Sequence, residues 1–372
     1  MHILFAGGGT AGHINPALAI AGYIKSKHPE AKISYIGTAQ KLEARLVPEA
    51  GYDFYTIDVA GFSRSLSIKG IAKNIVAVKK AVTSSIRAKK LLKSLKPDIV
   101  IGTGGYVSGP VLREAAKLGI KTAIHEQNAF PGVTTKMLAP NVDVIMLAME
   151  EAKKHLKINK EPVITGNPVR GEFLNIEKQE ARKRLGLGDK PMILSFGGSL
   201  GARPLNEAVI ELIKSHSKSG KYIHFHSTGK LGYESTVEAL KKGGVDLSSD
   251  ELRISEYINN MAECMAAADL IIGRAGAITL TEIQAVGRAS ILIPSPYVAE
   301  NHQFHNAMTL KARNAAEVIE EKDLSAEKLI NEVETILSSA ELSEAMGENA
   351  AKSAINNANE RIYECVMKLL NN

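Results

Sequence analysis

The sequence predicts an α/β protein with two Rossmann-like domains, each a doubly wound parallel sheet covered by helices. Its 372 residues are about two and a half times the ~150 residues of a typical domain. Short apolar runs alternate with longer helical patterns along the chain, which is typical of parallel sheets. The strand and glycine-rich turn at residues 3–12 (ILFAGGGTAG) have a counterpart at residues 193–202 (ILSFGGSLGA). Each half therefore opens with the same strand, turn and helix.

Six strands are expected in each half, apolar without strict alternation, as strands buried on both faces should be. In the first half they are His2–Ala6, Ile33–Ile36, Phe54–Ile57, Ile99–Ile101, Thr122–Ile124 and Val142–Met146. In the second half they are Met192–Phe196, Tyr222–Phe225, Leu252–Ile254, Leu270–Ile272, Ser290–Ile293 and Glu317–Ile319. The first domain is placed at residues 1–165 and the second at residues 166–349. A C-terminal helix at about residues 350–372 is left open to join the first domain.

The composition is that of a globular chain, with 45% hydrophobic and 23% charged residues. This excludes a disordered, collagenous or coiled-coil protein. No uncharged apolar run reaches the ~18 residues that a membrane-spanning helix needs, and the N-terminus lacks the pattern of a signal peptide. The two cysteines, Cys264 and Cys365, have no metal-ligand spacing. We therefore expect a chain that is kept in the cytosol.

Positive charge is concentrated in one segment. The chain has 46 Lys and Arg against 40 Asp and Glu, a net charge of +6. Between Val59 and Pro97 there are ten basic residues and no acidic one, which leaves 36 basic and 40 acidic residues elsewhere. From Ile68 to Ile86 apolar residues recur every three or four positions with basic residues opposite them, which predicts an amphipathic helix.

Two interpretations of this basic segment are open. It is a helix packed on the sheet with a solvated polar face, or it binds anionic lipid, where each Lys or Arg contributes ~1 kcal/mol. Nucleic acid is not expected as a partner, because the segment has Phe62 but no aromatic residues interleaved with the basic ones.

Two glycine-rich turns are candidate anion sites. Residues 7–13 (GGGTAGH) fit the pattern GxGxxG, but a dinucleotide site also needs an acidic residue at the end of the second strand, which reads YIGTA. Backbone N–H groups at a helix N-terminus still attract anions, and Thr10 and His13 add polar side chains. The turn at residues 197–201 (GGSLG) offers the same arrangement with Ser199. For the turn at residues 7–13, the alternative is a tight strand-to-helix turn that binds no anion.

Four more polar segments directly follow predicted strands. They are residues 102–110 (GTGGYVSGP), 125–128 (HEQN), 273–282 (GRAGAITLTE) and 294–303 (PSPYVAENHQ). Ordinary turn chemistry explains any one of them. Because the carboxyl ends of parallel strands share one edge of a sheet, where ligands bind, their common position predicts a binding site at that edge.

These segments, together with GNPVR at residues 166–170, resemble in their order the MurG family of glycosyltransferases over almost the whole chain. The resemblance implies the GT-B fold, in which two Rossmann-like domains face a cleft. It also implies an inverting transfer of N-acetylglucosamine (GlcNAc) from UDP-GlcNAc to the 4-hydroxyl of the muramyl sugar of lipid I, an undecaprenyl-pyrophosphoryl-MurNAc-pentapeptide. The product would be lipid II of peptidoglycan synthesis, and no cofactor is implied.

The resemblance also implies the site, residue by residue. In the second domain Glu282 would hold the ribose hydroxyls, Ser199 the diphosphate and the backbone at Ile258 the uracil. Arg170 would lie on the nucleotide side, and the sugar would be contacted by Gln303, Ala277, Ile278, Thr279, Leu280 and Thr281. From the first domain, the donor sugar and the acceptor diphosphate would be faced by Thr10, Ala11, Gly12, His13 and Asn128. The acceptor would be contacted by Gly104, Gly105 and Tyr106.

Two positions depart from the family pattern. Ala11 stands where the first loop usually has glycine, and Gly273 stands where serine is more familiar. Since alanine adds a methyl group and disfavours positive φ, we expect a less close approach of the backbone to a phosphate at Ala11 than glycine would allow.

The chemistry implied for this site uses no metal. The sequence has no Asp-x-Asp motif, with which many glycosyltransferases hold a divalent metal. The negative charge of the leaving UDP would be stabilised by helix N-termini, Ser199 and Arg170. His13 is the expected general base, since an imidazole titrates near neutral pH. Binding of the acceptor diphosphate is the other role open to His13.

The implied partners are UDP-GlcNAc, lipid I, an anionic membrane surface and other proteins of cell-wall synthesis. The implied location is the cytoplasmic face of the cell membrane, as a peripheral protein. Two other functions stay open. A UDP-GlcNAc 2-epimerase would share the fold and the donor but would need neither the basic segment nor the loop at residues 102–110. A nucleotide-sugar-binding scaffold would need no catalytic residue.

Overall fold

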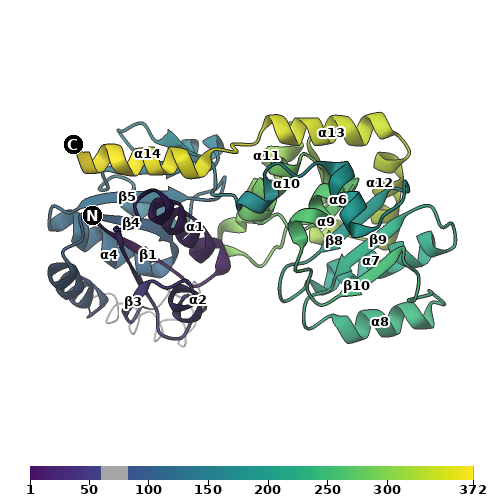
Figure 1. The fold of residues 1–372 in the computed structure, drawn as a ribbon, viewed down its shortest axis with the longest axis horizontal. Coiled ribbons are helices and arrows are strands. Elements are labelled where there is room, and N and C mark those ends of the chain that lie inside the picture. The colour runs from purple at the N-terminus through teal and green to yellow at the C-terminus, as the bar shows by residue number, and fades with distance from the viewer. Residues whose placement is uncertain (60–82, 372) are drawn as a thin grey trace. The chain divides into compact units, whose positions relative to one another are not determined.

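The structure is a computed structural model that describes residues 1–59 and 83–371, and it divides into two compact units (Figure 1). The first unit is Met1–Pro168 together with Asn357–Asn372, and the second unit is Val169–Asn356. The sequence placed this division between residues 165 and 166. Each unit is built on its own parallel sheet, and the two are described separately.

The first unit holds a parallel sheet whose described strands run in the order β3-β2-β1-β4-β5-β6-β7. Their bounds are β1 (His2–Gly7), β2 (Lys32–Gly37), β3 (Asp53–Thr56), β4 (Ile99–Gly104), β5 (Lys121–Glu126), β6 (Val144–Leu147) and β7 (Val163–Ile164). The two-residue β7 was not predicted, because so short a run shows no periodicity. His125 and Glu126 were expected to follow the fifth strand, and this was wrong: they are its last two residues and are buried.

Helices cover both faces of this sheet. They are α1 (Ala11–Lys27), α2 (Glu43–Glu49), a helix over residues 83–95, α4 (Gly105–Lys117), α5 (Val133–Leu138) and α14 (Ala358–Asn371), with a 3-10 turn η1 (Glu150–His155). Because neighbouring strand residues face opposite sides, Ile3 and Phe5 join one core and Leu4 joins the other. The last helix, α14, adds Ile362 and Val366 to the core of Ile3 and lies beside α1 and β5 (Figure 1).

The second unit repeats the plan with the strand order β10-β9-β8-β11-β12-β13. Its strands are β8 (Met192–Phe196), β9 (Ile223–Ser227), β10 (Leu252–Ser255), β11 (Leu270–Gly273), β12 (Ala289–Leu292) and β13 (Ala316–Val318). Its helices are α6 (Lys178–Leu185), α7 (Arg203–Ser217), α8 (Tyr233–Lys242), α9 (Met261–Ala267), α10 (Ala277–Val286), α11 (His302–Lys311), α12 (Ala326–Leu337) and α13 (Ala340–Lys352). Three 3-10 turns complete it: η2 (Gly171–Phe173), η3 (Ala299–Asn301) and η4 (Glu321–Asp323).

Much of the basic segment, including the predicted helix from Ile68 onward, lies outside the described residues. The described helix over residues 83–95 buries Ala88 and Leu92, whereas the side chain of Ile86 is 66% exposed. Ile86, the last residue of the predicted apolar face, therefore does not pack on the sheet, and the rest of that face lies outside the described residues. Within residues 1–59 and 83–371, no helix has both the length and the apolar character to cross a membrane.

Candidate active site

Each sheet reverses its strand order once, between β1 and β4 in the first unit and between β8 and β11 in the second. At such a point the two connections leave in opposite directions and open a crevice at the carboxyl ends of the strands, where ligands bind. The glycine-rich turns at residues 7–10 and 197–201 follow β1 and β8. The turns that the sequence analysis identified therefore lie at the ligand-binding positions of the fold.

In the first unit the β1 and β4 turns are packed backbone against backbone. Gly104 (φ 109°) and Gly105 (φ 78°) both have positive φ. A Cβ atom on Gly105 would lie 2.3 Å from the carbonyl oxygen of Gly8, and one on Gly104 would lie 2.5 Å from Nδ1 of His13. These two glycines, expected to contact the acceptor, are thus needed to bring the two turns together. Tyr106, in the first turn of α4, is 62% exposed.

The start of α1 differs from the expectation for Ala11. Thr10 is the extended cap residue (φ −143°, ψ 155°), and Ala11 is the first residue of the helix. Alanine is well suited to a helical φ, so the backbone at Ala11 does not need the positive φ that glycine would allow. The first N–H groups of a helix have no carbonyl partner within it, and those of Ala11 and Gly12 belong to exposed residues.

A buried carboxylate beneath the first turn was not predicted. Oε2 of Glu43 accepts a hydrogen bond from Gly9 N–H (3.1 Å), and Oε1 accepts from the backbone N–H (3.1 Å) and hydroxyl (2.7 Å) of Thr38. Glu43 is fully buried. This side chain takes up a backbone donor of the turn and adds negative charge, so the turn is a poorer anion site than its glycines indicate. The clue to Glu43 in the sequence was an acidic residue that lies beyond the second strand rather than at its end.

His13 lies at the edge of this turn and is half-buried. Its Nδ1 atom is 3.3 Å from Oε1 of Gln127. The hydroxyl of Thr103 donates to the His13 carbonyl oxygen (2.8 Å), which ties α1 to the end of β4. The structure therefore brings the predicted base together with Gln127, a residue to which the sequence analysis assigned no role.

Asn128 is held by its neighbour Glu126. The backbone N–H and the side-chain amide of Asn128 each donate to Oε1 of Glu126 at 3.1 Å. The other oxygen of Glu126 accepts from the Thr135 hydroxyl (2.5 Å) and from Gly132 N–H (3.1 Å). The orientation of Asn128 is thus set by a buried carboxylate.

In the second unit the turn after β8 also contains positive-φ glycines that approach a neighbouring backbone closely. Gly198 (φ 92°) and Gly201 (φ 82°) have positive φ, and a Cβ atom on Gly201 would lie 2.1 Å from the carbonyl oxygen of Thr228. Ser199 is exposed at the tip of the turn. No carboxylate among the described residues accepts a hydrogen bond from this turn. It is the better anion site of the two.

Arg170 and Glu282, which were predicted at the nucleotide, form an ion pair within the second unit. An Arg170 nitrogen is 3.2 Å from Oε1 of Glu282 and another is 2.8 Å from Glu172. The Arg170 guanidinium also lies 4.8 Å from the centre of the Phe173 ring. Burial raises the pKa of the Glu282 carboxyl, and the charge of Arg170 opposes that rise. A carboxylate can accept about four hydrogen bonds, so Glu282 retains acceptor positions for a ligand.

The remaining predicted residues of the second unit are spread along α10 and α11. Ile278 and Thr279 are half-buried, whereas Leu280 is fully buried in the core. The Thr281 hydroxyl donates to the Ala277 carbonyl oxygen within α10 (2.9 Å). Gln303, in the first turn of α11, accepts from Ser295 N–H through its side-chain oxygen (2.9 Å).

Two further residues of the second unit are Ile258, predicted to contact the uracil, and Arg274, the cation of the turn after β11. Ile258 follows β10 and is buried. Arg274 donates to the Ile293 carbonyl oxygen (3.0 Å) and pairs with the buried carboxylate of Glu321. Its guanidinium therefore braces the sheet edge and is not directed to a ligand.

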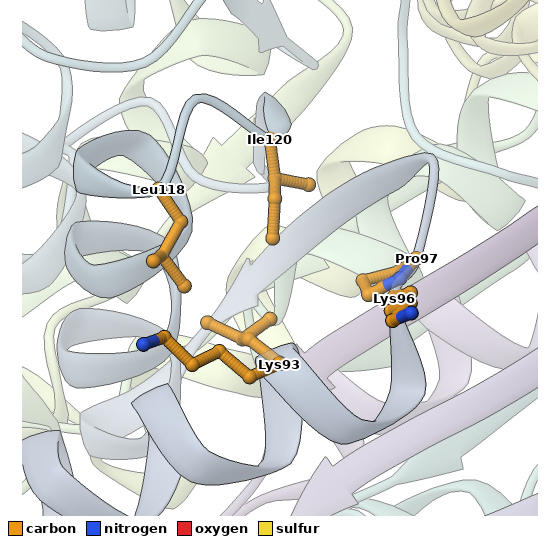
Figure 2. Close-up of a pocket in the computed structure, with 6 residues that line it drawn as sticks. Lys93, Lys96, Pro97, Leu118 and Ile120 are labelled. Carbon is orange, nitrogen blue, oxygen red and sulfur yellow. The ribbon is translucent and has the colours of Figure 1, made fainter.

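A separate hollow of 330 Å³ lies on the first unit (Figure 2). Its lining residues are Leu92, Lys93, Lys96, Pro97, Leu118 and Ile120. Since Pro97 precedes β4 and Ile120 precedes β5, the hollow lies at the amino ends of these strands. It is therefore at the edge of the sheet opposite the glycine-rich turns. Among the described residues no cluster of three or more His, Cys, Asp or Glu could hold a metal ion.

Both halves of the chain match one enzyme family. Residues 3–147 match the glycosyltransferase family 28 N-terminal domain, and residues 192–362 match the glycosyltransferase family 28 C-terminal domain. The UDP-N-acetylglucosamine--N-acetylmuramyl-(pentapeptide) pyrophosphoryl-undecaprenol N-acetylglucosamine transferase of Acetivibrio thermocellus is 46% identical over 373 aligned residues. The alignment covers 100% of this chain and 99% of that protein.

Solved structures separate a close likeness from a distant one. The crystal structure of Acinetobacter baumannii MurG is 30% identical, with a TM-score of 0.78 and 99% of both chains covered. The UDP-GlcNAc 2-epimerase of Neisseria meningitidis, solved with UDP-GlcNAc, is 14% identical with a TM-score of 0.63, over 99% of this chain and 100% of that one. At 14% identity the likeness to the epimerase shows a shared fold alone.

Proposed function

This chain belongs to glycosyltransferase family 28 and, within it, to the MurG family, and we propose from that premise how its residues carry the reaction. The protein is a UDP-GlcNAc-dependent glycosyltransferase of peptidoglycan synthesis that converts lipid I to lipid II. The observation that carries this conclusion is 46% identity over the full chain to a transferase of that name. The epimerase alternative has only the shared fold in its favour.

We propose that the second unit binds the donor. The turn after β8 has positive-φ glycines, an exposed Ser199 and no accepting carboxylate, which favours it as the diphosphate site. Glu282 would accept the ribose hydroxyls on the oxygen positions that Arg170 leaves open. The backbone at Ile258 would take the uracil. The sugar would be contacted by Gln303 and by the start of α10, Ala277, Ile278, Thr279, Leu280 and Thr281.

We propose that the first unit binds the lipid-linked acceptor and supplies the base. Gly104, Gly105 and Tyr106 would contact the acceptor, and the donor sugar and the acceptor diphosphate would be faced by Thr10, Ala11, Gly12, His13 and Asn128. In an inverting transfer His13 removes the proton of the acceptor hydroxyl, whose oxygen bonds to the anomeric carbon of GlcNAc while the bond from that carbon to UDP breaks. The N-terminus of α7 and Ser199 stabilise the charge of the leaving UDP without a metal.

We also propose a peripheral location on the cytoplasmic face of the cell membrane, bound to anionic lipid. The helix over residues 83–95 carries exposed basic side chains at Arg87, Lys89, Lys90 and Lys93, with Ile86 exposed among them. Each cation near an anionic surface contributes ~1 kcal/mol. Since the acceptor has a polyprenyl tail, proteins that make lipid I and use lipid II are the expected partners at that surface.

Incubation of labelled UDP-GlcNAc with a lipid I analogue tests the function directly. We expect GlcNAc to appear on the acceptor and no change in UDP-GlcNAc when the acceptor is absent. Formation of UDP-ManNAc without acceptor would instead show an epimerase. Absence of any turnover, with UDP-GlcNAc bound, would show a nucleotide-sugar-binding protein.

A further inference from the structure

Gln127 and His125 extend from the proposed base into the buried interior of the first unit. Gln127 is 2% exposed and His125 is 1% exposed. Nε2 of His125 lies 2.9 Å from the Gly166 carbonyl oxygen, and Nδ1 of His125 lies 3.1 Å from Nε2 of Gln127. Oε1 of Gln127 lies 3.3 Å from Nδ1 of His13. These three contacts form one connected series from the Gly166 carbonyl to the imidazole of His13.

Two backbone carbonyl groups determine which atom donates and which atom accepts in each of these three hydrogen bonds. A carbonyl oxygen only accepts, so Nε2 of His125 must carry the proton that faces Gly166. Burial lowers the pKa of His125, so its ring is neutral near pH 7 and its Nδ1 is an acceptor. The amide nitrogen of Gln127 also lies 2.9 Å from the carbonyl oxygen of His125. The NH2 group of Gln127 therefore faces His125, and its oxygen faces His13.

We infer that Gln127 and His125 are positioning residues that hold His13 in the tautomer with the proton on Nδ1. An oxygen acceptor opposite Nδ1 requires a proton there, and a neutral imidazole then has its lone pair on Nε2. Nε2 of His13 is the atom that removes the acceptor proton. This inference rests on the proposed role of His13 as the base.

The buried carboxylates beneath the first turn and beside Gln127 already have other hydrogen-bond partners. The carboxylate of Glu43 is engaged by Gly9 and Thr38, and that of Glu126 by Thr135, Gly132 and Asn128. Tyr106, the titratable residue two positions after Gly104, is exposed. Within the part of the chain that the structure describes, the side chain that hydrogen-bonds the His13 ring is that of Gln127.

The test compares two variants of Gln127 in the full chain. Methionine in Gln127→Met has nearly the size of glutamine but cannot accept a hydrogen bond of comparable strength, whereas the carboxylate of Gln127→Glu can. Long-range 1H–15N spectra of the 15N-histidine-labelled protein report the tautomer, with the His13 signals assigned by their loss in His13→Ala. Thermal unfolding checks that each variant is folded.

We expect the wild-type protein and Gln127→Glu to show the Nδ1-protonated form of His13, although Gln127→Glu loses the hydrogen bonds that the NH2 group donates at His125. Gln127→Met should shift His13 toward the Nε2-protonated form and lower kcat at least about tenfold, with the KM for UDP-GlcNAc unchanged. In Gln127→Glu the added negative charge should move the acidic limb of the kcat–pH profile upward. An Nε2-protonated His13 in the wild-type protein, or the same spectrum and kcat in Gln127→Met, would overturn the inference.

The same set of proteins separates this inference from the role of His13. His13→Ala should lower kcat by about 10² to 10⁴. If His13→Ala keeps more than a tenth of the wild-type kcat, His13 is not the base, even where the spectra show the expected tautomer. If His13→Ala is inactive and Gln127→Met is like the wild type in kcat and spectrum, the base is supported and the positioning role is lost.

Discussion

Glu282 and Arg170 show how a carboxylate can be buried and still be available to a ligand. Glu282 is 9% exposed, and an unpaired charge at such a position costs several kcal/mol. The guanidinium of Arg170, 3.2 Å away, compensates one oxygen and orients the group. Arg170 therefore acts on the proposed ribose site through Glu282, in addition to any charge it offers to the diphosphate.

Replacing Glu282 by glutamine tests this arrangement. Glu282→Gln should raise the KM for UDP-GlcNAc about tenfold or more, because hydrogen bonds to a charged acceptor contribute about 1.5–3 kcal/mol. Steady-state kinetics with a lipid I analogue measure it. Glu172→Gln is the matched control, since Glu172 also pairs with Arg170 but is exposed, and its KM should change by less than about threefold. Equal effects in both variants would contradict the assignment.

At the scale of elements, the close packing of the turns after β1 and β4 requires glycine at position 105 for two separate reasons. Gly105 has positive φ (78°), and its missing Cβ makes room for the carbonyl oxygen of Gly8. Gly119 has a similar φ (72°) at the end of α4, but open space surrounds it. The two positions separate backbone strain from close packing.

An alanine at each of these positions should therefore have different effects. Gly119→Ala should destabilise the protein by about 1 kcal/mol through strain alone. Gly105→Ala should cost about 2 kcal/mol more, since the methyl group meets backbone that must move. Urea unfolding followed by circular dichroism gives both values. If the two variants are equally stable, the contact with Gly8 is not a constraint.

Strand β9, which lies between β10 and β8 in the second sheet, carries two buried histidines. Burial lowers the pKa of His224 to about 3 and that of His226 to about 4. Within the described residues, Nδ1 of His224 and Nε2 of His226 have no hydrogen-bond partner. Both rings are therefore held neutral. Nδ1 of His226 is instead paired with the Ser195 hydroxyl at 2.8 Å.

These histidines predict a loss of stability in mild acid. Below pH ~6.5 the unfolded chain binds protons at both residues and the folded chain does not, so unfolding becomes easier until the pH falls to the folded-state values. From pH 7.5 to pH 5 each histidine should remove about 2 kcal/mol from the free energy of unfolding. His224→Gln should show a smaller loss over that range in urea unfolding. A pH dependence equal to that of the wild type would exclude His224 as its source.

At the scale of the whole molecule, the proposed chemistry stabilises the leaving group without a metal. The transferase activity should survive an excess of EDTA, because helix N-termini and side chains supply the positive potential. The assay is turnover of UDP-GlcNAc with a lipid I analogue before and after chelation. Complete loss of turnover that Mg²⁺ restores would contradict this mechanism.

The charge distribution predicts binding to anionic membranes through the first unit. The protein should float with phosphatidylglycerol-containing liposomes and not with neutral ones. Changing Lys89, Lys90 and Lys93 to Glu should abolish flotation. The same change at Lys218, Lys221 and Lys241, exposed residues of the second unit, should have a small effect. Equal binding of the wild type to neutral liposomes would remove the electrostatic proposal.

Much of the fold could be predicted from local patterns. Buried parallel strands are read from short apolar runs, and glycine-rich turns from their composition, because both depend on neighbours in the chain. The strand order and the covering helices then follow from general rules of connection. The predicted pairing of Glu282 with a nucleotide site came from resemblance, whereas its contact with Arg170, 112 residues away, appeared only in the structure.

The sequence by itself determined two repeated strand–turn–helix units, the edge of each sheet at which ligands are expected to bind, and one concentrated basic segment. Only the tertiary structure decided which polar groups near those turns are already engaged. Glu43 accepts a hydrogen bond from Gly9 N–H in the first turn, Arg274 donates to the Ile293 carbonyl oxygen, and Gln127 connects His13 to His125. Periodicity shows which side chains are buried, but a hydrogen bond depends on the distance and direction of two groups far apart in the chain.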